Sequence, residues 1–268
     1  MNKTLKEKLI FIFRRLFARR IFQSLWMPLH KLSMIGLNVS GGAEIASSGE
    51  RWVLRYIRAQ LNNPHACIFD VGANKGDFSR EVLSTFGPKI QLHAFEPSKI
   101  TFEALSSDPL LQRHSSLHNF GLSDLDQETE LFFPDTNTGH ASVYPSESTA
   151  NTHNFVRVER AVFRSLDSFC RQSHIKEIHF LKLDVEGHEL HVLQGATEML
   201  RQGAIQFIQF EFGEPNINSR TFFKDFFHLL SDQYSIYRIL VDGLSSIPKY
   251  NLIYESFYCT NYLAKRND

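Results

Sequence analysis

The order of short apolar runs along the chain constrains its fold more than any other feature. Such runs are typical of buried strands, and they alternate with stretches whose apolar residues recur at the spacing of an amphipathic helix. The runs cover residues 67–71, 90–95, 117–122, 179–185 and 205–212. This alternation predicts an α/β fold with a mostly parallel central sheet flanked by helices.

The helices are expected near residues 51–61, 78–86, 98–105, 190–200 and 221–230, with closing strands at 234–240 and 257–264. The alternation pauses over residues 123–165, where 130–133 and 155–162 are candidate strands around a polar loop. His140 lies in that loop and could cover a pocket, although a lone loop histidine is more often simply exposed. We expect one catalytic domain over residues 49–268, preceded by a basic helical segment over residues 1–48.

The beginning of the chain is strongly basic, although the whole chain has no net formal charge. Residues 1–35 contain eight Lys and Arg residues against Glu7 alone, a net charge of +7, so the remainder carries −7. A nucleic-acid-binding protein would be expected to carry its Lys and Arg on the folded body as well. The charge distribution therefore predicts that nucleic acid is not a partner.

The basic segment is also rich in large apolar residues. Arg14–Arg15 and Arg19–Arg20 interrupt them, so no run approaches the roughly 18 apolar residues of a spanning helix. The apolar stretch 9–13 is too short for the core of a signal peptide, and we expect a cytoplasmic protein. The segment could lie on an anionic membrane as an amphipathic helix or pack on the catalytic domain. The sequence leaves peripheral membrane contact through residues 1–35 open.

The first buried run ends in a loop, Asp70–Gly76, that reads Asp-Val-Gly-Ala-Asn-Lys-Gly. In a parallel sheet, ligands bind beyond the carboxyl ends of the strands, where the strand order reverses. Gly72 would let the backbone approach a ligand, and Gly76 would permit the turn into the next helix. Asn74 stands where a dinucleotide loop has its middle glycine, so a diphosphate fits poorly. S-adenosylmethionine has no phosphate and fits better, and Asp70 could hold its ammonium group directly or through water.

Acidic and polar residues follow the next two runs. A carboxylate at Glu96 can accept hydrogen bonds from both ribose hydroxyls, and Ser123 with Asp124 could meet the adenine amino group. Alone, the glycine spacing could mark a structural turn, and Glu96 could be a solvated residue at a helix start. The order strand, loop, helix, strand, acid favours a cofactor site formed by Asp70, Gly72, Asn74, Gly76, Glu96, Ser123 and Asp124.

A second acidic cluster follows the run at 179–185. Alternate residues of a strand share a face, so Lys182, Asp184 and Glu186 would lie together, with Glu211 ending the neighbouring strand. Methyl transfer to a hydroxyl requires alignment and a base for the proton. Asp184, Glu186, His188 and Glu211 are the candidates for catalysis or substrate binding. The alternative is a salt-bridge network with Lys182, and for His188 the structural and catalytic interpretations are equally open.

No stretch of the sequence has the spacing of a metal site. Carboxylates at Asp184, Glu186 and Glu211 could hold Mg²⁺, but we expect no metal. The three cysteines, Cys67, Cys170 and Cys259, also lack metal or redox spacing. They are expected to be isolated buried thiols.

Together these motifs resemble the FkbM family of S-adenosylmethionine-dependent methyltransferases. The resemblance covers about residues 50–215 and runs through Phe69–Gly76, Ala94–Pro97, Asn119 with Leu122–Asp124, Asn137-x-Gly139-x-x-Ser142, Ser165–Phe169, Leu181–Glu189 and Leu193–Ala196. It implies the class I, Rossmann-like methyltransferase fold and methyl transfer, typically to a hydroxyl oxygen. Members of this family act on macrolide-like natural products and on sugars or glycans.

The predicted function is O-methylation of a hydroxyl on a glycan, glycolipid or secondary metabolite, with S-adenosyl-L-methionine as cofactor. The basic segment favours an acceptor at a membrane surface, such as a lipid-linked saccharide. One alternative is a nicotinamide-dependent oxidoreductase, against which the loop spacing and the lack of a Tyr-x-x-x-Lys pair count. The other is a methyltransferase-like protein that binds without catalysis. The sequence does not predict an oligomeric state.

Overall fold

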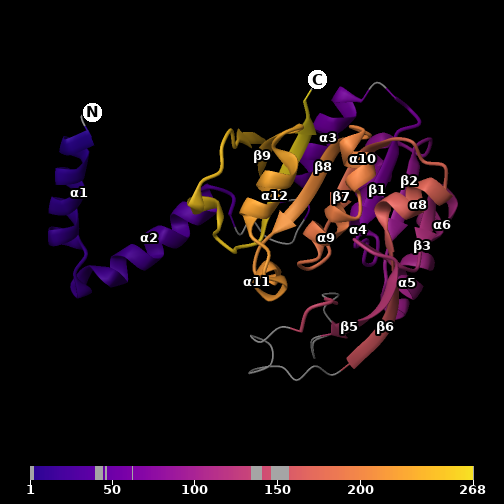
Figure 1. Ribbon diagram of the computed structural model, residues 1–268, viewed down its shortest axis with the longest axis horizontal. Coiled ribbons are helices and arrows are strands. Elements are labelled where there is room, and N and C mark those ends of the chain that lie inside the picture. Colours follow the sequence, from indigo (N-terminus) through magenta and orange to yellow (C-terminus); the bar gives the residue numbers. More distant parts are fainter. Residues whose placement is uncertain are drawn as a thin grey trace.

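The computed structural model describes residues 3–39, 45, 47–61, 63–133, 141–145 and 157–267. Figure 1 shows a body built around a central sheet with helices on both faces, and two helices, α1 and α2, that extend away from it. His140 and most of the polar loop expected around it lie outside the described residues.

The central sheet has eight strands in the order β10-β9-β11-β8-β7-β1-β2-β3. β1 (Cys67–Val71) pairs in parallel with β2 (Gln91–Phe95) on one side and with β7 (Ile178–Leu183) on the other. β11 (Thr260–Arg266) lies antiparallel between β8 and β9. The predicted mostly parallel α/β fold is confirmed. The strand order reverses at β1, which places the switch point at the carboxyl ends of β1 and β7.

The remaining strands are β3 (Ser115–His118), β4 (Gly121–Ser123), β5 (Gln127–Phe133), β6 (Arg157–Ser165), β8 (Ile205–Phe212), β9 (Tyr234–Leu240) and β10 (Gly243–Ser246). One face of the central sheet packs on α3 (Glu50–Gln60), α4 (Asp77–Phe86), α5 (Lys99–Ser106) and α6 (Pro109–His114). The other face packs on α8 (Leu166–Gln172), α9 (Glu189–Gln194), α10 (Thr197–Arg201) and α12 (Phe223–Leu230). Two short elements, α11 (Pro215–Ser219) and η2 (Leu252–Tyr254), lie in connections.

Local sequence explains where these elements pack and begin. Alternation along β1 sends Ile68 to the core under α3 and α4, and Phe69 to the core under α8 and α9. Helix α5 begins where the Ser98 hydroxyl accepts a hydrogen bond from the Thr101 amide, which is the usual role of a serine at the N-cap. The pattern Ser47-x-x-Glu50 is typical of a capping box, but helix α3 does not begin with one, because its N-cap residue is Gly49 with a φ of +93°.

The strand expected at residues 117–122 is divided in the structure. β3 joins the edge of the central sheet, whereas β4 belongs to a separate three-stranded sheet in the order β4-β6-β5. The Asn119 amide donates to the carbonyl oxygens of Glu96 and Pro97, and it thereby holds the chain in the turn between the two strands. The prediction of one continuous strand was wrong because apolar periodicity does not reveal which sheet a strand joins.

The basic segment forms α1 (Lys3–Phe17), a turn η1 (Arg20–Phe22) and α2 (Gln23–Gly36). No residue of α2 is buried, and residues 5–21 are all exposed. Among the described residues, no helix combines the length and the apolar character needed to cross a membrane. A boundary between this segment and the catalytic domain near residue 48 stays a prediction.

Two histidines are packed against each other inside the body. His93 Nδ1 of β2 lies 3.1 Å from His118 Nε2 of β3, and the two rings are stacked beside Phe95 and Phe169. Burial lowers the pKa of each to about 4, and for His118 the neighbouring His93 and Arg164 lower it further. Both rings are therefore neutral in the folded protein near pH 7.

We expect His118→Phe to make folding less sensitive to acid. A histidine pKa below its unfolded value means that the unfolded chain takes up the proton first, so stability is lost as pH falls from about 6.5 to about 4. The free energy of unfolding of the wild type should fall by about 1–2 kcal/mol more than that of the variant over this range, after allowance for solvent screening. Urea titrations at several pH values measure it. His228→Phe, at an exposed site, is the control, and equal pH dependence in wild type and His118→Phe would contradict the assignment.

Candidate active site at the strand switch point

The loop after β1 is held in a conformation that few residues adopt. Gly72, Asn74 and Gly76 have φ values of +82°, +49° and +86°. The amides of Gly72 and Ala73 both donate to the carbonyl of Phe95, at 3.0 and 2.9 Å. These two hydrogen bonds therefore fix the loop against the end of β2.

Gly72 is also required for a contact within the protein. A Cβ at Gly72 would lie 1.8 Å from the carbonyl oxygen of Asp184, so only glycine permits the approach to the end of β7, and its role beside a ligand stays a prediction. Gly76 fits its prediction as the turn into α4, and a Cβ there would meet the side chains of Leu111 and Leu105 at 2.3 and 2.9 Å.

Glu96 stands directly beside this loop. One carboxylate oxygen accepts from the Asn74 amide at 3.0 Å, and the other accepts from the Ser98 amide at 2.9 Å. The side chain is buried, and burial raises its pKa to about 7, with smaller contributions in the same direction from Glu159 and Asp70. The carboxyl groups ending β1 and β2 thus lie close enough to interact.

Asp70 belongs to a buried ionic cluster instead of lining an open surface. It is 0% exposed, and its carboxylate accepts from the Ser79 hydroxyl at 2.6 Å. Lys182 Nζ lies 3.8 Å from Asp70 Oδ1 and 2.9 Å from Asp184 Oδ2. Burial alone would lower the pKa of Lys182, but Asp184, Asp70 and Glu50 raise it above its ordinary value. Asp70 is therefore fully buried, and its contact with the ammonium group of the cofactor, directly or through water, stays a prediction.

Glu50 completes the cluster from the first turn of α3. Its two oxygens accept from Gln209 Nε2 at 2.7 Å and from the Ser48 hydroxyl at 2.9 Å. Burial raises the pKa of Glu50, and the positive charge of Lys182 opposes the shift. The polar face predicted for β7 therefore continues onto β8 and α3.

Beyond Lys182, the predicted carboxylates gather at the carboxyl ends of β7 and β8. The register places Leu183 beside Phe210, so Asp184 and Glu211 follow on neighbouring strands. Burial raises the pKa of Glu211 well above its ordinary value, and the charges of Asp184, Glu186 and Glu189 raise it further, against a hydrogen bond with the Cys259 thiol. Asp184 is 40% exposed on its side chain, so this group opens to solvent.

Glu186 and Glu189 shape the turn that carries this cluster. Glu186 has a φ of +53°, so strand alternation does not extend to it, although Lys182 and Asp184 share a face as predicted. The buried carboxylate of Glu189 accepts from the amides of Val185 and Gly187 at 2.9 and 3.2 Å. Glu189 thus holds the turn at the start of α9 (Glu189–Gln194).

The ring of His188 contacts the smaller sheet through Ser123 of β4. Its ring nitrogens lie 2.9 Å from the Ser123 hydroxyl and 2.9 Å from the Tyr144 hydroxyl, and its ring stacks on His191. It is 5% exposed, and burial lowers its pKa to about 4. Because both nitrogens are engaged, the geometry favours a structural residue over a general base.

The same network contains the two residues predicted to meet the adenine. The Ser123 hydroxyl donates to Asp124 at 2.8 Å, and His191 lies 3.5 Å from Asp124. Ser123 is 0% exposed, whereas Asp124 is partly exposed. The structure therefore joins Ser123 and Asp124 to His188 and does not place either in contact with Asp70 or Glu96. Their cofactor role stays a prediction.

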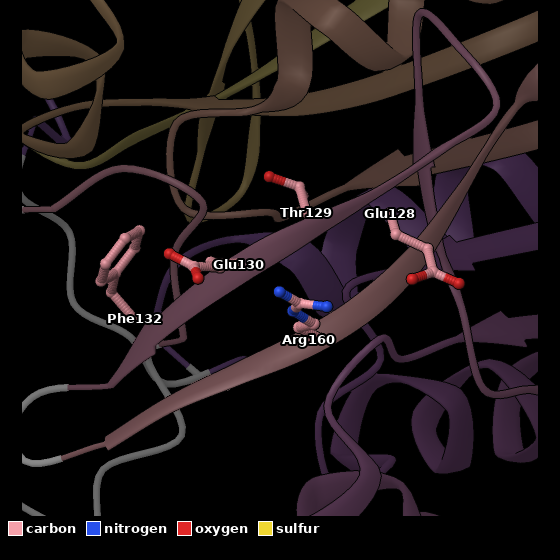
Figure 2. Close-up of a pocket in the computed structure, with 5 residues that line it drawn as sticks. All are labelled: Glu128, Thr129, Glu130, Phe132 and Arg160. Carbon is pink, nitrogen blue, oxygen red and sulfur yellow. The ribbon is translucent and has the colours of Figure 1, made fainter.

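Within the part of the chain that the structure describes, no three His, Cys, Asp or Glu side chains are arranged to hold a metal ion. A pocket is present on the outer side of β5 and β6, and Figure 2 shows the five residues that line it: Glu128, Thr129, Glu130, Phe132 and Arg160. Glu130 and Arg160 lie opposite each other on the paired strands. None of the predicted site residues lines this pocket, so the site is defined by the switch point.

Sequence reasoning missed Glu50, Gln209 and Tyr144. The Ser47-x-x-Glu50 pattern suggested a capping box, which hid the possibility of a buried glutamate. Gln209 lies in the run 205–212, which also contains Gln206 and Glu211, and a polar residue in a strand expected to be buried was the available signal. Tyr144 offers no local signal, because its contact with His188 joins residues 44 apart.

The model of the methyltransferase FkbM domain family matches residues 70–236. The chain belongs to the FkbM methyltransferase family. The match contains the β1 loop, Glu96 and both acidic strand ends, and the sheet described above is the class I methyltransferase arrangement of that family. FkbM methyltransferases use S-adenosylmethionine, which is thus the cofactor. The match favours the methyltransferase interpretation over a nicotinamide-dependent oxidoreductase.

Curated relatives of this FkbM methyltransferase include a hexuronic acid methyltransferase, AglP, from Haloferax volcanii. The two are 28% identical over 157 residues, which is 57% of this chain and 59% of AglP. Methyltransferase 1 from Beauveria bassiana is 28% identical over 149 residues, 49% of this chain and 58% of that protein. The chain thus matches less than two thirds of the length of either relative.

Among solved structures, the chain is similar to a methyltransferase FkbM from Methylobacillus flagellatus. The similarity covers 78% of this chain and 46% of that one, with 15% identity and a TM-score of 0.46. The plantazolicin methyltransferase BpumL in complex with SAH aligns over 95% of this chain and 93% of its own, with 9% identity and a TM-score of 0.45.

Lys182→Met should strongly destabilise this FkbM methyltransferase, because it leaves the fully buried Asp70 without its cation. The free energy of unfolding should fall by about 3–5 kcal/mol in a urea titration. Arg51→Met is the matched control, since it breaks the more exposed ion pair with Glu81 and should cost less than about 1 kcal/mol. Equal losses in the two variants would contradict the structural importance given to Lys182.

Proposed function

We propose that this chain transfers a methyl group from S-adenosylmethionine to a hydroxyl oxygen of a saccharide, glycolipid or secondary-metabolite acceptor. The observation that carries the proposal is the meeting of two sets of residues at one switch point. The loop Gly72–Gly76 and Glu96 form one set, and Asp184 with Glu211 forms the other. The family membership supports methyl transfer, and the acidic set supports a hydroxyl acceptor.

The first set fits the cofactor. Each oxygen of Glu96 accepts one backbone amide, and a carboxylate oxygen has a second lone pair, so both oxygens can still accept a ribose hydroxyl. The two amides fix the carboxylate in place, which reduces the ordering needed on binding. When bound, S-adenosylmethionine supplies a methyl group activated by its sulfonium charge. Ser123 and Asp124 stay candidates for the adenine end, through the exposed side of Asp124.

The second set supplies the base. In our proposal Glu211 takes the proton of the acceptor hydroxyl, because a carboxylate whose pKa is raised by burial is a stronger base than an ordinary one. Asp184, paired with Lys182, orients the acceptor from the solvent-facing side. Glu186 adds negative charge near both and stays an alternative base. His188 holds the smaller sheet in place through its contact with Ser123.

A saccharide acceptor is favoured by the curated relative named as a hexuronic acid methyltransferase. Hydroxyl-rich acceptors also suit a site lined by carboxylates, which accept hydrogen bonds from hydroxyl groups. A glycolipid would combine such a headgroup with a lipid anchor. A protein that binds the cofactor without transferring its methyl group is the competing interpretation, and the activity measurement below separates the two.

Glu96→Ala should weaken cofactor binding at least tenfold, since it removes a charged acceptor for two ribose hydroxyls. Thermal unfolding with increasing S-adenosylhomocysteine measures the affinity through saturable stabilisation. Glu103→Ala, on the exposed side of α5, is the control and should bind as the wild type does. Unchanged affinity in Glu96→Ala would contradict the assignment of Glu96 to the ribose. Stabilisation by NADH, and not by S-adenosylhomocysteine, would favour the oxidoreductase interpretation.

Glu211→Gln should lower kcat/KM for methyl transfer by about 10²–10⁴-fold while cofactor binding is retained. Transfer of labelled methyl from S-adenosylmethionine into a hexuronic-acid oligosaccharide, or into extracted glycolipid, measures it. Glu198→Gln, at an exposed position of α10, is the control. Retained activity in Glu211→Gln would show that Glu211 is not the base.

The pH dependence gives an independent check on the base. Activity should rise with pH through the raised pKa of Glu211, because the base must be ionised. In Asp184→Asn this rise should move to lower pH, since one of the negative charges that raise the pKa of Glu211 is gone. A shift to higher pH, or none, would contradict the coupling between the two carboxyls.

A further inference from the structure

The segment α1–α2 carries a concentration of exposed apolar side chains that the body lacks. Of the 27 large apolar residues that are exposed in the described part of the chain, 15 lie between Leu5 and Leu37. Most are half-exposed or more, including Phe11 at 64%, Ile21 at 74% and Leu32 at 65%. Soluble proteins rarely leave so large an apolar surface uncovered without a partner for it.

These side chains are ordered into stripes along the two helices. Leu5, Leu9, Ile12 and Leu16 recur at helical spacing on one side of α1, and Leu25, Leu29 and Leu32 do so on α2. The sequence alone did not suggest one clean stripe, because it did not show that the segment is two helices joined by a turn at Arg20–Phe22.

Aromatic side chains fix the junction between the helices. The Trp26 indole donates to the Phe17 carbonyl at 3.0 Å, and its ring lies beside those of Phe13 and Phe17. The two apolar stripes therefore belong to one preformed unit. Figure 1 shows this unit projecting from the body, with the far end of α1 away from the sheet.

Charge separates this unit from the rest of the molecule. Residues 1–35 carry +7 and the remainder −7, and four of the basic residues, Arg14, Arg15, Arg19 and Arg20, flank the junction. An anionic surface attracts the helices and repels the body. The molecule would therefore approach such a surface with α1 and α2 first.

We propose that α1 and α2 dock on an anionic lipid bilayer, lying in its interface with their leucine-rich stripes toward the acyl chains. Apolar burial and attraction of Lys and Arg to acidic headgroups act together in this mode of binding. The lengths of the helices fit lying on the membrane rather than crossing it, in agreement with the absence of a spanning helix among the described residues. The proposal does not depend on the chemistry of the active site.

Flotation with lipid vesicles tests the docking directly. The intact protein is mixed with vesicles of equal parts phosphatidylcholine and phosphatidylglycerol, or with phosphatidylcholine alone. We expect flotation with the anionic vesicles, weakened by salt because the charges are exposed, and little with the neutral ones. Leu9→Asp/Leu16→Asp should reduce binding at least tenfold, and Arg14→Glu/Arg15→Glu should reduce it in the anionic case.

A matched variant separates this surface from exposed apolar residues in general. Leu252→Asp/Ile253→Asp makes the same change at side chains that are 76% and 70% exposed on η2, and it should float as the wild type does. Cofactor-induced thermal stabilisation should be the same in all variants, which shows that the body is folded.

Three outcomes would overturn the proposal. The first is the lack of flotation of the intact protein with anionic vesicles, and the second is equal flotation of Leu9→Asp/Leu16→Asp. The third is sedimentation of the lipid-free protein as a dimer that does not bind vesicles and that Leu9→Asp/Leu16→Asp converts to a monomer, which would make the surface an interface between copies of the chain.

Discussion

The ammonium group of Lys182 is the interaction on which the rest of the site depends. It lies among carboxylates of three different elements, with Asp70 on β1, Asp184 after β7 and Glu50 on α3. Each of these charges would be costly to bury alone, and together they are stable only while all are in place. The cation thus fixes the spacing of β1 and β7 at the point where the strand order reverses.

That spacing determines how the two halves of the proposed site face each other. Gly72 follows Asp70 by two residues, and its missing Cβ lets the loop reach the carbonyl of Asp184. The cofactor side and the acidic side are therefore joined through backbone contact as well as through charge. Lys182 offsets part of the rise that burial causes in the pKa of Asp70. The carboxyl groups of Glu211 and Glu96 also have raised pKa values, and burial is the largest influence on each.

The sequence predicted what depends on periodicity and on residue type next to a strand end. The parallel sheet, the turn at Gly76 and the shared face of Lys182 and Asp184 all follow from such local patterns. It could not predict contacts that join distant parts of the chain. Gln209 and Glu50 are 159 residues apart yet hydrogen-bonded, and no local pattern indicates such a pair. Residues 115–123 form two strands because β3 pairs in the central sheet and β4 pairs in the smaller one. These pairings also join distant parts of the chain, so no local pattern indicates them.

The smaller sheet connects the two halves of the site from outside. At one end, Glu159 of β6 accepts hydrogen bonds from Ser98 and Lys99, just after the carboxyl group of Glu96. At the other end, Ser123 of β4 holds His188, just after the acidic turn of β7. The fit at this second contact is close, because a Cβ at Gly195 would lie 1.9 Å from the Ser123 carbonyl. A displacement of this sheet would therefore move residues at the carboxyl ends of both β2 and β7. Because both ring nitrogens of His188 are engaged with hydroxyl groups, the histidine connects this sheet to the acidic turn, and the carboxyl groups stay the proposed acceptors of the proton.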